Sequence, residues 1–110
     1  MRKLSWLIVL LMTVSIINYP NPFNPKGGET ATFECTSAST FEAAIYLYDM
    51  SAQLLLRKAF SIAGGAVNRI TWNGYSDANE LASNGVYLYR LINASTRQSA
   101  AKGKLWIINR

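Results

Sequence analysis

The chain has 110 residues, enough for one domain; half of them are apolar and 15% are charged, a composition that favours a packed core over disorder. It contains no histidine, so the commonest general base and the commonest metal ligand are both missing, which argues against an enzyme. The net charge of +5 comes from scattered Lys and Arg residues in runs no longer than two, so ordinary surface charge is a better interpretation than nucleic-acid binding.

Residues 1–15 have the pattern of a secretory signal peptide or hydrophobic leader. A basic start, Met1–Lys3, precedes the apolar run Leu4–Val14, which is shorter than the about 20 residues that a membrane-spanning helix needs. Cleavage after Ser15 would leave a domain of residues 16–110. Two alternatives stay open: an uncleaved anchor lengthened by the next two isoleucines, or the first strand of the domain if the chain is a fragment of a longer protein.

All three prolines lie within the segment Tyr19–Pro25, where they alternate with asparagines around one phenylalanine. Proline fixes φ, lacks an N–H and biases the preceding residue toward extended geometry. Asparagine amides can bond nearby backbone groups in place of a strand ladder. We therefore expect a stiff lead-in that makes no ladder and presents Tyr19 and Phe23 as two apolar anchors.

The following residues form short alternating runs bounded by turn residues. The expected strands are 29–35, 41–48, 53–60, 67–72, 85–93 and 102–108. The single cysteine, Cys35, lies in the first of them; it excludes an internal disulfide and should be a small buried apolar residue. Strand-sized runs about ten residues apart, with no convincing helix, predict an all-β fold, a small antiparallel sandwich with alternate residues buried between two sheets.

Further motifs follow the Pro/Asn segment in a fixed order. They are Leu47-Tyr48-Asp49, Gly64-Gly65 with Trp72-Asn73-Gly74, Ser83 to Tyr89, and a Lys-apolar strand from Lys104 to Arg110. Together, over roughly residues 18–110, they resemble the immunoglobulin-like module of the flagellar hook-capping protein and the related C-terminal sorting domain of type IX secretion cargo. Ala52 stands where the family has a turn glycine, Asn73 replaces an aspartate, and Asn84 is inserted.

The resemblance implies an immunoglobulin-like β-sandwich of about seven strands, with no enzymatic activity and no cofactor. It implies a secretion and sorting module that directs export or surface attachment of a secreted bacterial protein, by way of the periplasm. Its partner would be a protein of the secretion machinery or of the cell surface, with membrane contact through the leader alone and no nucleic acid. The motif and recognition residues would be Tyr19, Pro20, Asn21, Pro22, Phe23, Asn24, Pro25, Trp72, Gly85, Tyr87, Tyr89, Lys104 and Arg110.

Two other functions stay open from the sequence. One is a structural or adhesive module whose exposed edge strands pair with a partner or with another copy of the chain. The other is carbohydrate binding on an aromatic surface formed by Trp72, Tyr87, Tyr89 and Trp106, although strand alternation should bury half or more of these residues.

The polar loop 73–84 is the one candidate for a metal site. Its oxygen-bearing residues are Asn73, Asp77, Asn79 and Glu80. Oxygen-rich loops can bind Ca²⁺, but the spacing here is not that of an EF-hand. We therefore interpret these residues as turn formers, and expect neither a metal site nor a catalytic residue.

Overall fold

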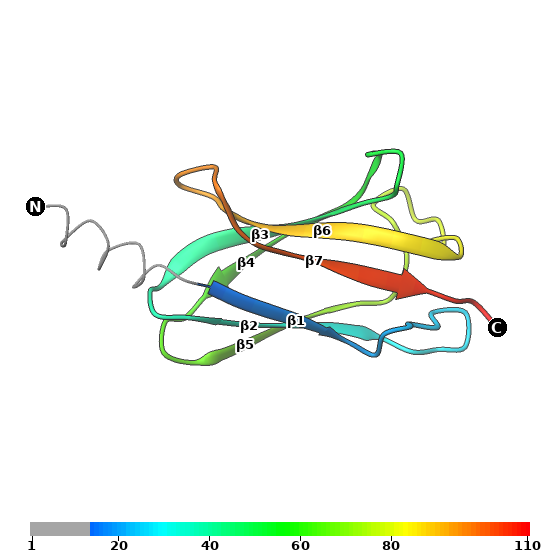
Figure 1. The fold of residues 1–110 in the computed structure, drawn as a ribbon, viewed down its shortest axis with the longest axis horizontal. Helices are drawn as coiled ribbons and strands as arrows, with labels where there is room; N and C mark the ends of the chain where they lie inside the picture. The colour runs from blue at the N-terminus through cyan, green and yellow to red at the C-terminus, as the bar shows by residue number, and fades with distance from the viewer. Residues whose placement is uncertain (1–13) are drawn as a thin grey trace, which may run out of the picture.

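The computed structural model describes residues 14–110, in which seven β-strands form two antiparallel sheets. The strands are β1 (Val14–Tyr19), β2 (Ala31–Ser37), β3 (Phe41–Tyr48), β4 (Leu54–Ile62), β5 (Val67–Trp72), β6 (Gly85–Asn93) and β7 (Ser99–Ile107). The three-stranded sheet has the order β1-β2-β5 and the four-stranded sheet the order β4-β3-β6-β7. Figure 1 shows the sheets as two stacked layers, with β1 and β7 next to each other. The predicted all-β sandwich is confirmed.

Compared with immunoglobulin domains, the sandwich differs in one detail and agrees in another. The fourth strand pairs with the third, whereas in immunoglobulin constant domains it belongs to the opposite sheet. Near the start of β6, the Tyr87 hydroxyl donates a hydrogen bond of 2.6 Å to the Ser83 carbonyl. This contact matches the tyrosine corner of immunoglobulin-like domains, in which a tyrosine at the start of the sixth strand bonds back to the backbone upstream.

Strand alternation places the core between the sheets. In β6, Tyr87, Tyr89 and Leu91 are buried while Leu88 and Arg90 are exposed, which is the expected period of two. The larger apolar cluster includes Phe23, Phe33, Ile45, Leu47, Trp72, Tyr89, Leu105 and Ile107. A smaller one consists of Cys35, Ala43, Ile62 and Leu91, with partly buried side chains around it.

Cys35 is fully buried, as predicted. Burial, and next to it the charge of Glu34, raises the pKa of its thiol to about 11, because a thiolate is poorly solvated in an apolar core.

The first and last strands differ from the sequence-based expectations. Strand β1 begins at Val14, so it includes the last two residues of the expected leader, and it pairs with β2 along its whole length. The other residues of that leader, 1–13, lie outside the described part of the chain. Strand β7 begins at Ser99, three residues early, because pairing of its start with Ile92 outweighs the weak strand propensity of serine and alanine. Within residues 14–110, no helix is long and apolar enough to cross a membrane.

Candidate functional site: the Pro/Asn segment and the C-terminal strand

The Pro/Asn segment leaves β1 and runs beside the end of β7. The Tyr19–Pro20 and Asn21–Pro22 peptide bonds are both cis. Phe23 forms a parallel bridge with Ile107: its N–H donates to the Trp106 carbonyl over 2.7 Å, and its carbonyl accepts from the Ile108 N–H over 3.0 Å. The expectation of a lead-in without ladder bonds is wrong at this residue, because the bridge uses the N–H and C=O of Phe23 alone and needs no donor from a proline.

The Phe23 side chain is an anchor in the core. It is fully buried, and its ring centroid lies 5.9 Å from that of Trp72. Gly74, two residues after Trp72, has φ +91°, and a Cβ there would lie 2.3 Å from the Cβ of Pro25. The Pro/Asn segment and the Trp-Asn-Gly motif are therefore complementary parts of one contact, although they are about fifty residues apart in the sequence.

Tyr19 does not act as a second apolar anchor, which corrects the expectation from the sequence. It is 40% exposed, and its hydroxyl donates to Glu34 Oε1 over 3.0 Å. The reason is its place in the ladder: Tyr19 is the last residue of β1, opposite Thr32, and its side chain lies on the outer face of the three-stranded sheet.

Three asparagine side chains fix the last residues of the chain. Asn21 Oδ1 accepts from the Trp106 N–H (2.9 Å), and Asn84 Oδ1 accepts from the Asn109 N–H (2.7 Å). Asn24 Oδ1 accepts from the N–H groups of both Gly27 (3.0 Å) and Arg110 (3.1 Å). We call Asn21, Phe23, Asn24 and Asn84 the terminal clamp.

Asn109 completes this arrangement from the other side. Its Nδ2 donates to the Ala82 carbonyl over 3.0 Å, and its Oδ1 accepts from the Lys26 N–H over 3.3 Å. The expected bonding of asparagine amides to backbone groups is found, but the inserted Asn84 and the terminal Asn109 were not recognised from the sequence as part of it. The one sequence signal for Asn109 is its amide next to the last residue of the chain, and no local signal marks Asn84.

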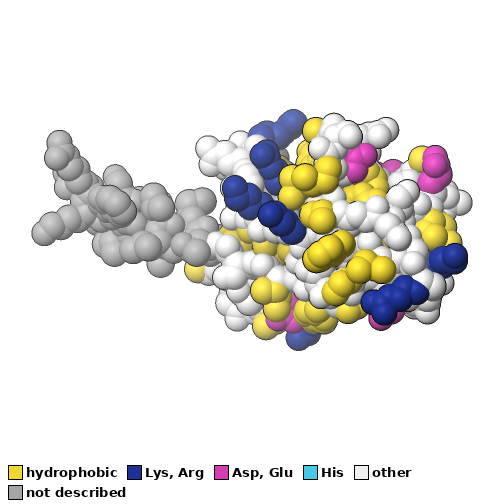
Figure 2. All heavy atoms as spheres, turned by 45° about the vertical axis from the view of Figure 1, so that its right-hand side comes forward, with side chains coloured by type: hydrophobic (Ala, Val, Ile, Leu, Met, Phe, Trp, Pro, Cys, Tyr) yellow, Lys and Arg dark blue, Asp and Glu magenta, His cyan; other side chains and the backbone are white. Residues whose placement is uncertain are grey.

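Strand β7 exposes Lys104 and Trp106 while Leu105 and Ile107 are buried. Lys104 and Trp106 belong to the outer face of the four-stranded sheet. We call the outer face of this sheet the cationic face; its outward side chains include Glu42, Tyr46, Tyr48, Leu54, Arg57, Leu88, Arg90, Lys102, Lys104 and Trp106. Figure 2 shows Lys and Arg side chains gathered beside a band of hydrophobic side chains on the visible side of the molecule.

Aromatic rings lie among these cations. Arg57 donates from Nε to the Tyr46 hydroxyl over 2.9 Å, and its guanidinium carbon lies 5.6 Å from the centroid of the Tyr46 ring. The rings of Tyr46 and Tyr48 are stacked, with centroids 6.4 Å apart. Trp106 is 53% exposed at the end of the face, where its backbone is held by the terminal clamp.

A hollow of about 300 Å³ lies on this side of the sheet. It is lined by Tyr48, Asp49, Met50, Ala52, Leu88 and Arg90. Ala52, at the family's glycine position, has φ +65°, so the turn keeps the left-handed conformation that glycine adopts without strain. Asp49 stabilises this turn, because its Oδ1 accepts from the N–H groups of Ser51 and Gln53.

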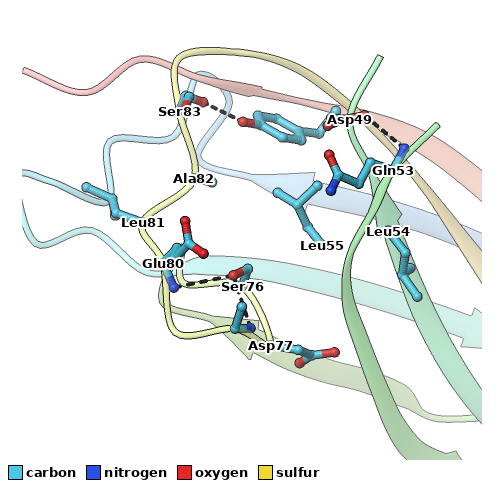
Figure 3. A pocket seen from close by; sticks show the side chains of 12 residues that line it. Asp49, Gln53, Leu54, Leu55, Ser76, Asp77, Glu80, Leu81, Ala82 and Ser83 are labelled. Atoms are coloured by element: carbon cyan, nitrogen blue, oxygen red, sulfur yellow. Dashed lines mark hydrogen bonds between the residues drawn. The ribbon is translucent and has the colours of Figure 1, made fainter. Parts of the chain in front are cut away.

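A second, more polar pocket of about 480 Å³ lies between the 49–53 turn and the loop 73–84. Figure 3 shows Ser76, Asp77 and Glu80 at its border. Asp77 Oδ2 accepts from the Arg57 N–H, and Ser76 Oγ accepts from the N–H groups of Ala78 and Glu80. Asn73 Oδ1 likewise accepts from the Tyr75 N–H. The Ser76 and Asn73 oxygens serve the loop's own turns, and the Asp77 carboxylate joins the loop to β4. No group of three His, Cys, Asp or Glu suited to a metal ion occurs among residues 14–110.

The aromatic surface that the sequence left open as a glycan site is not formed, because strand alternation buries most of its residues, as predicted. Trp72, Tyr87 and Tyr89 are buried, and of the four aromatic residues Trp106 alone is exposed. The Tyr89 hydroxyl donates to Asn18 Oδ1 over 2.5 Å, and burial, followed by the nearby Cys35, raises the pKa of Tyr89 to about 12.

Two glycines lie at special positions of β6 and β7. Gly103 leaves room for the Tyr89 hydroxyl, since a Cβ there would lie 2.3 Å from it. Gly85, with φ +152°, begins β6.

The predicted recognition residues therefore lie in different parts of the molecule. Trp72, Tyr87 and Tyr89 belong to the core and Gly85 to a strand start. Pro20 to Pro25 link the core with the end of β7, whereas Tyr19 lies on the outer face of the three-stranded sheet. Lys104 lies on the cationic face, and Arg110 is held through its backbone.

Comparison with known proteins gives similarity of fold. No protein-family model matches the chain, and no curated protein matches it. Among solved structures, dimeric latent PorU from Porphyromonas gingivalis superposes with a TM-score of 0.73 at 22% identity, over 88% of this chain and 9% of that one. PorZ from the same bacterium, described as an essential surface component of the type IX secretion system, superposes with a TM-score of 0.56 at 18% identity, over 86% and 12%.

This chain thus spans about a tenth of the length of the two proteins that it resembles. The similarity places its fold beside that of a β domain found in a type IX secretion component. It does not support the flagellar hook-capping half of the resemblance, which stays a prediction from the sequence. A β-glucosidase from Listeria innocua superposes with a TM-score of 0.48 at 14% identity, too distant to bear on function.

Proposed function

We propose that the chain is a non-enzymatic sorting module of type IX secretion, which directs a secreted bacterial protein to export or to attachment at the cell surface. The observation that carries the proposal is the fixed presentation of the C-terminal strand. The terminal clamp holds the backbone from Trp106 to Arg110, while the side chains of Lys104 and Trp106 remain exposed on the same strand. An ordered backbone with accessible side chains can be bound by a receptor with little rearrangement.

Two further points support the proposal. The fold resembles a β domain in PorZ, a component of this secretion system. The sequence motifs resemble those of the sorting-domain family over roughly residues 18–110. The partner would be a protein of the secretion machinery or of the cell surface, and the destination the cell surface or the medium.

The test is a transport assay. Residues 14–110 are fused to the C-terminus of a reporter that enters the periplasm by its own signal peptide, in a bacterium with a type IX secretion system. We expect the reporter to become accessible to added protease on intact cells. Retention in the periplasm, with the module folded, would contradict the proposal.

A pair of variants tests the role of β7 in the same assay. Lys104→Ser with Trp106→Ser removes exposed side chains without opening the core, and should reduce export. Val67→Ser with Arg97→Ser removes exposed side chains elsewhere and should leave export unchanged. Equal export of the two variants would show that recognition does not use β7.

A further inference from the structure

Three cations lie together on the cationic face. The register of β6 and β7 places Arg90 directly opposite Lys102. Lys104 lies two residues further along the same side of β7, about 7 Å away at the usual rise of a strand. Like charges directly opposite each other destabilise a sheet. None of the three takes part in an ion pair within residues 14–110, so folding alone gives no reason to place them together.

The outer face of the three-stranded sheet is different. Its one cation, Arg69, donates from Nε to Glu34 Oε1 over 3.0 Å, and Tyr19 donates to the same oxygen. This cation is neutralised by the fold itself. On the cationic face the one outward carboxylate, Glu42, accepts instead from the Ser61 hydroxyl.

Apolar side chains accompany the cations. The hollow of about 300 Å³ has Tyr48, Met50 and Leu88 in its lining, together with two charged residues, Arg90 and Asp49. The Asp49 Oδ1 atom already accepts two N–H groups of its own turn. Met50 is 69% exposed, and Leu54, across from Tyr48, is 46% exposed. Tyrosine, tryptophan, methionine and arginine are the residues enriched at protein interfaces.

We propose that the cationic face docks an acidic segment of another protein, with an apolar side chain of that segment in the hollow beside Leu88 and its carboxylates on Arg90, Lys102 and Lys104. The inference rests on the proposed function for its biological setting and deepens it, because it gives the chemistry of the partner. Charge complementarity selects the anionic partner.

The apolar side chains of the face favour an acidic protein segment over an anionic glycan or a lipid surface. Leu54, Leu88 and Met50 offer a glycan no hydrogen bonds. A lipid surface favours apolar side chains that project beyond the basic ones, whereas Tyr48 and Leu88 line a hollow.

The experiment is an NMR titration of the full 110-residue chain with short synthetic peptides. The first peptide combines glutamates with leucine, the second replaces leucine by serine, and the third replaces glutamate by lysine. We expect the first peptide to bind at low salt, to shift amide signals of β6 and β7, and to bind more weakly as salt is added. The serine peptide should bind more weakly and the lysine peptide not at all.

Two double variants remove the same charge from different places. Arg90→Gln with Lys102→Gln should weaken binding of the Glu/Leu peptide by about tenfold or more, because both lose charged hydrogen-bond donors. Lys26 and Arg97 lie outside the cationic face, so Lys26→Gln with Arg97→Gln should change binding of the same peptide by less than about twofold. Leu88→Ser should abolish the preference for the leucine peptide over the serine peptide.

Other results would contradict this inference, the sorting role, or both. No binding, equal weakening by the two double variants, or signal shifts confined to the three-stranded sheet would overturn it. Tighter binding to heparin or to vesicles containing anionic lipid would replace the acidic protein by a glycan or a membrane. Peptide binding without export of the reporter would contradict the sorting role alone, whereas export by a module that binds no acidic peptide would contradict this inference alone.

Discussion

At the terminal clamp, the oxygens of Asn21, Asn24 and Asn84 all accept backbone N–H groups, and Phe23 is fully buried. On the cationic face, Arg90 and Lys102 oppose each other, and neither takes part in an ion pair among the described residues. The two regions meet at Trp106, whose backbone is held by the clamp while its side chain lies exposed on the face.

The comparison indicates that the terminal clamp serves the stability of the fold and the cationic face serves binding. Polar groups that are already satisfied within the fold stabilise it and have little left to offer a partner. Charges that lack a partner add nothing to the fold and remain available for an interaction. Substitutions in the clamp should therefore change the free energy of unfolding, and substitutions on the face should change binding.

The largest expected effect is at Phe23. Phe23→Ala removes a fully buried ring that contacts Trp72, and should lower the free energy of unfolding by about 3–5 kcal/mol. Phe23→Leu keeps most of the volume and should cost about 1 kcal/mol. Urea unfolding followed by circular dichroism measures both. A loss below about 1 kcal/mol for the alanine variant would mean that the segment is not an anchor of the core.

Gly74 tests the contact between the clamp segment and the Trp-Asn-Gly motif. Gly74→Ala places a Cβ 2.3 Å from Pro25 Cβ at a φ of +91°, and should cost about 3 kcal/mol from overpacking and backbone strain together. Gly28→Ala is the matched control: its φ is +90° but no atom lies within 4 Å of the new Cβ. It should cost about 1 kcal/mol, the backbone part alone. Equal losses for the two variants would remove the steric argument.

Asn24 tests the hydrogen bonds of the clamp. Asn24→Ala leaves the N–H groups of Gly27 and Arg110 without their acceptor, and should lower the free energy of unfolding by about 1–2 kcal/mol. Asn24→Asp keeps an acceptor oxygen and should lose less than half as much. Hydrogen exchange at the Arg110 amide adds a local measurement, since its protection should fall in the alanine variant and persist in the aspartate variant.

The parts of the fold that follow from local sequence were predictable. The side chains of 85–93 alternate between two sides, and a sandwich buries one side of each strand. Tyr87 and Tyr89 share one side and Leu88 and Arg90 the other, and the structure buries the first pair. The bounds of β5 and β6 were predicted correctly for the same reason. Strand β1 was partly hidden, because its apolar residues continue the pattern of the leader.

The contacts of the candidate site depend on pairing between distant segments. Nothing local to Asn84 indicates that its amide oxygen meets the backbone of Asn109, twenty-five residues further on. The same holds for the charges. Arg90 and Lys102 are isolated from each other in the sequence and become opposed because β7 starts at Ser99 and returns beside β6 in this register, so a scattered distribution of charge becomes a cluster on the surface.

The smallest expected change in stability is at Lys102, where one substitution should stabilise the fold and weaken binding of the acidic peptide. Lys102→Glu puts a carboxylate opposite Arg90 and should raise the free energy of unfolding by about 0.2–1 kcal/mol, the range for favourable cross-strand pairs. The same variant should lose binding of the acidic Glu/Leu peptide, because one cation is removed and a second is neutralised. Arg97→Glu, an exposed substitution outside the cationic face, makes the same change in net charge and should neither stabilise the fold nor abolish peptide binding.

A Lys102→Glu variant that is less stable than the parent chain would mean that the cations already have a role within the fold, and the distinction between the clamp and the face would then fail. A more stable variant that no longer binds would show that the sheet keeps this pair of like charges at a cost to its own stability, which is the behaviour expected of a surface shaped by a partner.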